Sequence, residues 1–159
     1  MLRVDRRDLS RGPVRTDGEL EPDHPALKDL GLDLVGPVRV KGQLQATGDG
    51  EYLWRGSLQG MFRSACRRCL TEVITELDVD VPAAVFCSDP DAADDPESYP
   101  LAERAGAVDV ADVVREELAL ASTQANLALC REDCAGLCPR CGADLNAGPC
   151  RCHAPAEPV

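Results

Sequence analysis

The sequence predicts an α+β fold: a curved antiparallel β meander or partly open barrel that carries one main helix and a cysteine-rich C-terminal tail. Three observations lead to this prediction. Apolar and polar residues alternate over three stretches between residues 38 and 81, which is the period of a half-buried strand. A helical pattern follows from about residue 109. Eight of the nine cysteines fall into four close pairs, three of them after residue 129.

Composition divides the 159 residues, about one domain's length, into three parts. Residues 1–35 mix arginine with glycine and proline and predict an extended N-terminal arm, with an edge strand near residues 2–8. Residues 36–129 are expected to form an antiparallel sheet plus a helix. Within them, residues 88–107 predict an acidic flexible loop, because prolines and acids interrupt any periodic burial. Residues 130–159 form the cysteine-rich tail.

Three strands are expected in the sheet, over residues 38–47, 51–65 and 71–81. Gly48-Asp49-Gly50 supplies the positive backbone angles of a tight hairpin between the first two. Gly56 and Gly60 fall on the aromatic face of the second strand, where glycine suits a bulge or strong curvature. The residues that share a predicted inner face are Val38, Val40, Leu44, Ala46, Tyr52, Trp54, Leu58, Phe62, Val73, Thr75, Leu77, Val79 and Val81.

The helix is expected to begin near Asp109, whose carboxylate can accept hydrogen bonds from the free N–H groups of the first turn. Because no proline interrupts the following residues, the helix is predicted to run on toward Leu129. Its predicted buried stripe consists of Val110, Val113, Val114, Leu118 and Ala121.

Charge is distributed unevenly along the chain. The formal net charge is −11, and residues 71–128 alone carry 14 acidic and 2 basic residues. Such an acidic segment argues against a protein that coats nucleic acid and favours a basic partner protein; acid that serves only solubility is the alternative. No stretch is apolar enough for a signal peptide or a membrane span, so we expect a cytoplasmic protein with no membrane partner.

The cysteines point to metal, because paired cysteines in a reducing compartment are typical of metal ligands rather than disulfides. A Cys-x-x-Cys turn presents two sulfurs to one ion, and Gly142 after the second cysteine of Cys138-Pro139-Arg140-Cys141 lets backbone N–H groups turn toward the thiolates. The four cysteine pairs are Cys66/Cys69, Cys130/Cys134, Cys138/Cys141 and Cys150/Cys152. They suffice for two four-thiolate sites, so the tail is predicted to bind one or two structural zinc ions.

Two groupings of these pairs remain open at the level of sequence. In the preferred one, Cys66/Cys69 shares an ion with Cys130/Cys134, and Cys138/Cys141 shares another with Cys150/Cys152. In the other, Cys66/Cys69 joins Cys138/Cys141 as a split zinc ribbon. Redox-active thiols and an iron–sulfur cluster are alternatives to zinc.

No catalytic site is expected. The two histidines, His24 and His153, have no evident carboxylate or nucleophile beside them, and the common nucleotide, hydrolase and metalloprotease motifs do not occur. A zinc ion saturated by four sulfurs has no open position for catalysis. We therefore expect neither an enzyme nor a small-molecule substrate.

A group of cations on the predicted hairpins is the candidate surface for a partner or for RNA. A solvated face balanced by the acids of the neighbouring strand is the alternative. The cations are Arg39, Lys41, Arg55, Arg63, Arg67 and Arg68.

The sequence resembles the YceD family of bacterial large-ribosomal-subunit rRNA accumulation proteins. The resemblance rests on Gly36-Pro-Val-Arg-Val, Cys66-Arg-Arg-Cys69-Leu70, the helix at residues 109–118, and the tail with its Gly-Leu-Cys-Pro-Arg-Cys-Gly-Ala-Asp-Leu-Asn segment at residues 136–146. It implies a non-enzymatic factor needed for accumulation or processing of large-subunit (23S) rRNA, with no catalytic residue to carry over.

The functional hypothesis is therefore a ribosome biogenesis factor that binds a basic ribosomal protein or rRNA-processing factor, with the basic hairpin as a candidate contact for large-subunit rRNA. One alternative is a redox-switched zinc holdase chaperone, in which an oxidant would release zinc. Another is a zinc-ribbon module of the transcription machinery.

Overall fold

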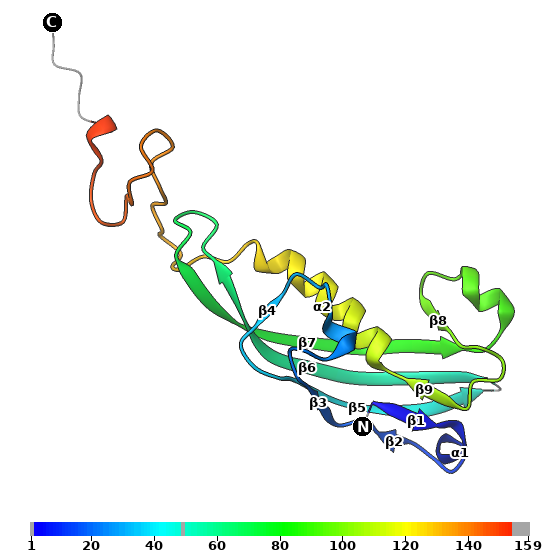
Figure 1. The fold of residues 1–159 in the computed structure, drawn as a ribbon. Helices are drawn as coiled ribbons and strands as arrows, with labels where there is room; N and C mark the ends of the chain where they lie inside the picture. The colour runs from blue at the N-terminus through cyan, green and yellow to red at the C-terminus, as the bar shows by residue number, and fades with distance from the viewer. Residues whose placement is uncertain (1, 49, 154–159) are drawn as a thin grey trace, which may run out of the picture.

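The computed structural model describes residues 2–48 and 50–153. Within this part of the chain, three long strands dominate a seven-stranded sheet (Figure 1). They are β5 (Val38–Gly48), β6 (Glu51–Ala65) and β7 (Glu72–Cys87). The other elements are β1 (Arg3–Asp5), α1 (Arg6–Leu9), β2 (Val14–Arg15), β3 (Gly18–Leu20), η1 (Pro25–Leu27), β4 (Asp33–Leu34), η2 (Pro90–Asp94), β8 (Ser98–Pro100), β9 (Ala107–Asp109), α2 (Ala111–Ala125) and η3 (Arg151–His153).

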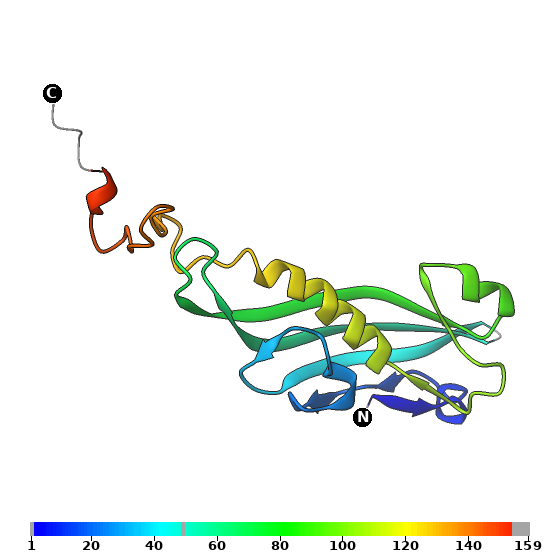
Figure 2. The same ribbon diagram turned by 45° about the horizontal axis from the view of Figure 1, so that its top comes forward.

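The predicted fold class is confirmed. The sheet is mostly antiparallel, with strand order β2-β5-β6-β7-β8, and one main helix, α2, lies across it (Figures 1 and 2). The sheet is open rather than closed into a barrel. The end of the β6–β7 hairpin projects past the helix, and the cysteine-rich tail continues beyond it. No helix in the described residues is long and apolar enough to cross a membrane.

The β5–β6 hairpin has the inner face that the alternation predicts. Val38, Val40 and Leu44 are buried on β5, as are the aromatic residues of β6 and Leu58. The hairpin turns where predicted, and Gly50 has a φ of 74°; Asp49 lies outside the described residues. The prediction is wrong for Ala46, which the alternation predicts on the inner face but which is exposed near the hairpin end.

Two glycines of the hairpin face each other beneath the indole of Trp54. Gly42 and Gly56 are partners in the β5–β6 register. A Cβ atom at Gly42 would lie 2.6 Å from Trp54 Nε1, and one at Gly56 would lie 2.4 Å from Trp54 Cζ2. Both distances are shorter than atoms tolerate, so the glycines make room for the only tryptophan of the chain.

The third strand, predicted over residues 71–81, extends to Cys87 as β7, and the set of its residues that face inward changes along its length. Leu77 and Val81 are buried in the first part of β7, and Ala84 and Phe86 are buried in the last part. The β6–β7 register passes from Gly56↔Val81 to Trp54↔Ala84, so two residues of β7 stand opposite one of β6. This β-bulge shifts the inward parity by one, which lets the strand continue to Cys87 with its apolar residues inside.

The N-terminal segment is more structured than the predicted arm. β1 lies within residues 2–8, where the sequence predicts an edge strand, but it pairs with β9 rather than with the main sheet. β2 and β3 pair with β5, and β4 pairs with β6. Because Val4, Leu9, Leu20 and Leu27 are buried in the main core, burial of these scattered leucines and valines holds the segment on the sheet. The boundary at residue 35 stays a prediction.

The acidic segment 88–107 contains short elements where the sequence predicts a flexible loop. η2 is followed by β8, which pairs parallel with the end of β7. Phe86 and Tyr99 pack ring against ring, with centroids 5.2 Å apart. This aromatic contact fixes β8 on the sheet.

The predicted stripe is buried: Val110 immediately before helix α2, and Val113, Val114, Leu118 and Ala121 within it. The Asp109 carboxylate accepts the N–H of Ala111 at 2.9 Å, as expected, although Val110 rather than Asp109 is the N-cap residue. The helix ends at Ala125 rather than near Leu129. The chain leaves the helix early because the Ala128 carbonyl accepts the N–H of Arg67 at 2.9 Å, which draws the following residues to the hairpin.

A buried hydrogen bond between Thr16 and Trp54 provides a test of this core. Trp54 Nε1 donates to Thr16 Oγ1 at 2.7 Å, and both side chains are fully buried. Thr16→Val keeps the shape but leaves the indole N–H without a partner, which should lower the free energy of unfolding by about 1–3 kcal/mol. Urea unfolding followed by Trp54 fluorescence measures the change.

Thr16→Ser is the matched control, since it keeps the hydroxyl group and loses only a methyl. A Thr16→Val protein as stable as both the wild type and the Thr16→Ser protein would contradict a stabilising role for this hydrogen bond.

Candidate metal centres

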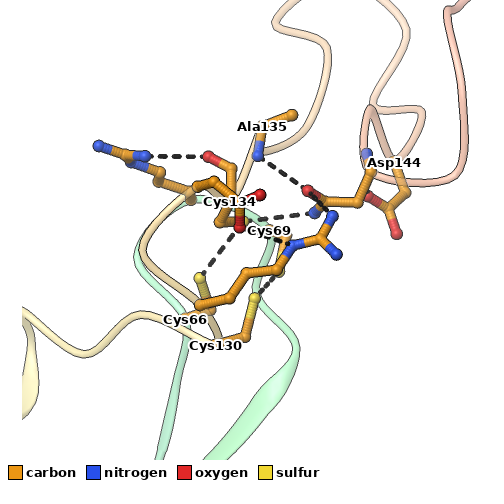
Figure 3. Close-up of polar contacts among 10 residues, drawn as sticks. Cys66, Cys69, Cys130, Cys134, Ala135 and Asp144 are labelled. Carbon is orange, nitrogen blue, oxygen red and sulfur yellow. Dashed lines mark hydrogen bonds and ion pairs between the residues drawn. The ribbon is translucent and has the colours of Figure 1, made fainter.

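The first cysteine cluster joins two parts of the chain that are distant in sequence. Cys66 and Cys69 lie in the turn between β6 and β7, whereas Cys130 and Cys134 lie in the segment after α2 (Figure 3). Three of these four side chains are buried, and only Cys130 is exposed. The cluster therefore sits between the hairpin end and the chain that leaves the helix.

Sulfur positions in this cluster fit a tetrahedral metal. Cys66 Sγ lies 3.8 Å from Cys134 Sγ, Cys69 Sγ lies 3.6 Å from Cys130 Sγ, and all four sulfurs lie within 4.8 Å of one another. A tetrahedron with zinc–sulfur bonds of about 2.3 Å has sulfur–sulfur distances of about 3.8 Å. A disulfide bond, at about 2.05 Å, is far shorter, and all nine cysteines are free.

Backbone N–H groups surround the first sulfur of this turn. The pKa of Cys66 is lowered from 9.0 to about 6, chiefly by a hydrogen bond from the backbone of Cys69. The pKa of Cys69 is lowered chiefly by the hydroxyl group of Thr71, which lies 3.2 Å from its sulfur. The turn thus favours the thiolate form that a metal requires.

The second cluster lies in the tail and brings together Cys138, Cys141, Cys150 and Cys152. These four sulfurs also lie within 4.8 Å of one another. The pKa of Cys138 is lowered to about 6, chiefly by the backbone of Cys141. Cys138 is buried, Cys150 and Cys152 are half-buried and Cys141 is exposed, so this cluster is more open to solvent than the first.

Both clusters contain the same backbone turn. The N–H of Leu70 donates to the Cys66 carbonyl at 2.9 Å, and the N–H of Gly142 donates to the Cys138 carbonyl at 2.8 Å. The two residues have φ angles of 64° and 73°. Glycine adopts this left-handed conformation freely, whereas leucine does so at a cost.

Two other thiols, one in each cluster, show what a bound cation would do there. The pKa of Cys130 is raised to about 12 by loss of hydration and by the nearby sulfurs of Cys69 and Cys134. The pKa of Cys152 is also raised to about 12, chiefly by the sulfur of Cys141. Four adjacent thiolates repel one another, and a divalent cation removes this repulsion. The residues present therefore fit a metal held by four sulfurs.

Polar residues tie the start of the tail to the first cluster (Figure 3). Asn146 Oδ1 accepts the N–H of Ala135 at 2.8 Å, and its Nδ2 donates to Cys134 Sγ at 3.3 Å. Arg68 Nη1 donates to the Cys134 carbonyl at 2.9 Å, and the Arg68 carbonyl accepts the N–H of Leu137 at 3.1 Å. Asn146 ends the Gly-Leu-Cys-Pro-Arg-Cys-Gly-Ala-Asp-Leu-Asn segment, but no residue pattern in the sequence predicts its contacts with the first cluster.

The structure groups the eight cysteines as in the preferred pairing, not as in the split ribbon. The six candidate cations are all exposed, but three have partners within the protein. Arg39 pairs with Glu19 at 3.0 Å, Arg63 pairs with Asp33 and Glu72 at 3.4 and 3.3 Å, and Arg68 holds Cys134 as described. Lys41, Arg55 and Arg67 are the cations of this set whose side chains have no hydrogen-bond or ion-pair partner in the described part of the chain.

The left-handed leucine of the first cluster leads to a prediction. Leu70→Gly should remove roughly 1–2 kcal/mol of backbone strain against about 0.5–1 kcal/mol of added chain entropy in the unfolded state. The metal-loaded variant should therefore melt at a temperature equal to or above that of the wild type, as measured by circular dichroism.

Leu127→Gly is the matched control, because Leu127 is also an exposed leucine, at 60% against 67% for Leu70, and has no positive φ. It should lower the melting temperature, since it adds the same entropy and relieves no strain. If Leu70→Gly and Leu127→Gly lower the melting temperature equally, the left-handed conformation at Leu70 carries no strain.

Residues 54–158, more than half of the chain, match the family model described as "Large ribosomal RNA subunit accumulation protein YceD". No curated protein and no solved structure matches the chain. The matched segment contains most of β6, all of β7 and α2, and both cysteine clusters. The resemblance seen in the sequence is thereby confirmed, and the chain belongs to the YceD family of large ribosomal RNA subunit accumulation proteins.

Proposed function

We propose that this protein is a non-enzymatic ribosome biogenesis factor that promotes accumulation or processing of large-subunit rRNA by binding other molecules in the cytoplasm. The observation that carries the proposal is the family match over residues 54–158. The site chemistry supports binding rather than catalysis, because a metal ion held by four protein sulfurs keeps no position for water or substrate.

We propose zinc as the metal in both clusters, with Cys66, Cys69, Cys130 and Cys134 as one ligand set and the four tail cysteines as the other. The support is the donor set: four thiolates within 4.8 Å of one another suit zinc, and each Cys-x-x-Cys turn presents two of them. Bound there, zinc would supply structure. It would fix the hairpin end against the chain that leaves α2, and it would fold the tail.

We propose a basic protein, such as a ribosomal protein or a processing factor, as the principal partner. Support comes from the acidic segment 71–128 and from its place in the fold. The outward residues of β7 include Glu76, Asp78 and Asp80, whose partners in β6 are Met61, Gln59 and Ser57 rather than cations. A positively charged surface would therefore meet uncompensated acid there.

Direct contact with rRNA is the finer part of the proposal and would involve the basic hairpin. The side chains of Lys41, Arg55 and Arg67 are available to bind phosphate groups, since the other three cations already bind carboxylates or a carbonyl oxygen. Three phosphate contacts would give a modest, salt-dependent affinity. In this proposal, contacts with a protein partner therefore contribute more to function than direct contacts with RNA.

The alternative of a redox-switched holdase chaperone would rest on the tail cluster. Its exposed Cys141 and half-buried Cys150 and Cys152 are open to an oxidant, whereas three cysteines of the first cluster are buried. Oxidation would thus unfold the tail before the sheet. We keep this function second, because the family match points to rRNA.

The test is the rRNA content of cells that lack the protein. The ratio of large-subunit to small-subunit rRNA, measured by electrophoresis of total RNA, should fall below the wild-type ratio. Reintroducing the wild-type chain should restore it. The Cys66→Ser/Cys69→Ser variant should not, because the hairpin end would lose its attachment. A normal ratio in cells without the protein would contradict the proposed function.

A further inference from the structure

Other strands cover the two edges of the sheet to different extents. Along β5, the strands β2 and β3 cover the stretch from Val38 to Leu44, and β4 covers the adjacent end of β6. Along β7, β8 pairs only with Val85, Phe86 and Cys87. Residues 72–81 of β7 pair with β6 on one side, and no strand among the described residues pairs with them on the other.

An uncovered strand of this length exposes backbone hydrogen-bonding groups. In an antiparallel pair every second residue directs its N–H and C=O away from its partner. Such an edge is a template for another extended segment. Residues 72–81 therefore offer a ladder that one further strand can complete.

Side chains beside this edge indicate what that strand should look like. On the outer face β7 presents Glu72, Glu76, Asp78 and Asp80 together with Ile74, which is 48% exposed. Of the four acids, Glu72 pairs with Arg63. An added strand would place every second side chain on this face, where basic side chains are favoured.

Apolar side chains are favoured on the inner face. Helix α2 crosses the sheet obliquely and passes over β7 (Figures 1 and 2). Arg115 donates to the Ala26 and Lys28 carbonyls on one side of the helix, and Glu116 accepts from Tyr99 of β8 on the other. Leu120, one turn after Glu116, is therefore on the side toward β7 and β8, and it is 58% exposed. An added strand would lie beside it.

We propose that the open edge of β7 at residues 72–81 binds an extended segment of a basic partner protein, whose basic and apolar residues alternate, as an additional strand of the sheet. The segment's backbone completes the ladder, its lysines or arginines face the acids of β7, and its apolar residues face α2. This inference deepens the proposed function and rests on its basic protein partner, for which it names the binding surface and the binding mode.

The negative charge of this edge favours a basic polypeptide over a second copy of the chain or RNA. A second copy of the chain would bring its own β7 acids against these, and like charges across neighbouring strands are unfavourable. RNA would bring phosphates to the same acids. A basic polypeptide alone matches both the backbone ladder and the charge.

The experiment uses the full, zinc-loaded, isotope-labelled chain and a synthetic peptide of ten alternating lysine and valine residues. Amide NMR signals of residues 72–81 should shift on titration, and their hydrogen exchange should slow. The same peptide with alternate backbone nitrogens methylated keeps its charge but cannot complete the ladder, so it should not bind. The glutamate–valine counterpart should not bind either.

Charge-reversal variants supply the matched control. Glu76→Lys/Asp78→Lys should weaken binding of the lysine–valine peptide about tenfold, because each change replaces an attraction with a repulsion. Asp91→Lys/Asp94→Lys changes the net charge equally within η2, away from this edge, and should leave the dissociation constant nearly unchanged. Zinc content and the NMR spectrum of each variant establish that it is folded.

Equal binding of the methylated peptide, or equal weakening by both variants, would overturn the proposal in favour of diffuse charge attraction. Self-association through residues 72–81, or shifts of the same amide signals when an RNA oligonucleotide is added without the peptide, would overturn it in favour of a second copy or RNA. The rRNA measurement tests the proposed function separately, so a normal rRNA ratio with intact peptide binding, or the reverse, shows which of the two fails.

Discussion

The attachment of the β6–β7 hairpin to the chain after α2 is the contact on which the rest of the structure depends. Aromatic residues make up only 3% of the chain, so an apolar core alone supplies limited stabilisation. Four sulfurs within 4.8 Å bring the hairpin end and the helix exit together. Because helix α2 lies across the sheet and buries its apolar stripe in the core, this attachment also fixes the C-terminal end of that helix.

The same attachment places the tail. Arg68, in the hairpin turn, binds Cys134 through its side chain and Leu137 through its carbonyl, so the first cluster aligns the start of the second. Gly136 has a φ of 80°, and a Cβ there would lie 3.2 Å from the Arg68 carbonyl oxygen. The hairpin and the tail thus approach each other closely at one glycine. A metal in the first cluster would therefore organise more of the chain than its own four ligands.

Sequence patterns predicted those features that depend on local periodicity. The inner faces of β5 and β6 and the buried stripe of α2 followed from alternation and helical spacing, since burial repeats regularly there. Features set by distant contacts could not be predicted in this way. The two- and three-residue strands β2, β3 and β4 are too short to show a period, and the face change in β7 depends on a bulge. Likewise, the choice between the two cysteine groupings depends on where the tail packs, and Asn146 gains its role only through that packing.

The most direct test of the central claim is the zinc stoichiometry of the freshly purified chain, measured by elemental analysis and repeated for Cys66→Ser and Cys138→Ser. We expect two ions per wild-type chain and one in each variant, because each variant disrupts one self-contained cluster. One ion in the wild type that both variants lose would contradict the two-cluster arrangement. It would mean that the hairpin and the tail share a single site.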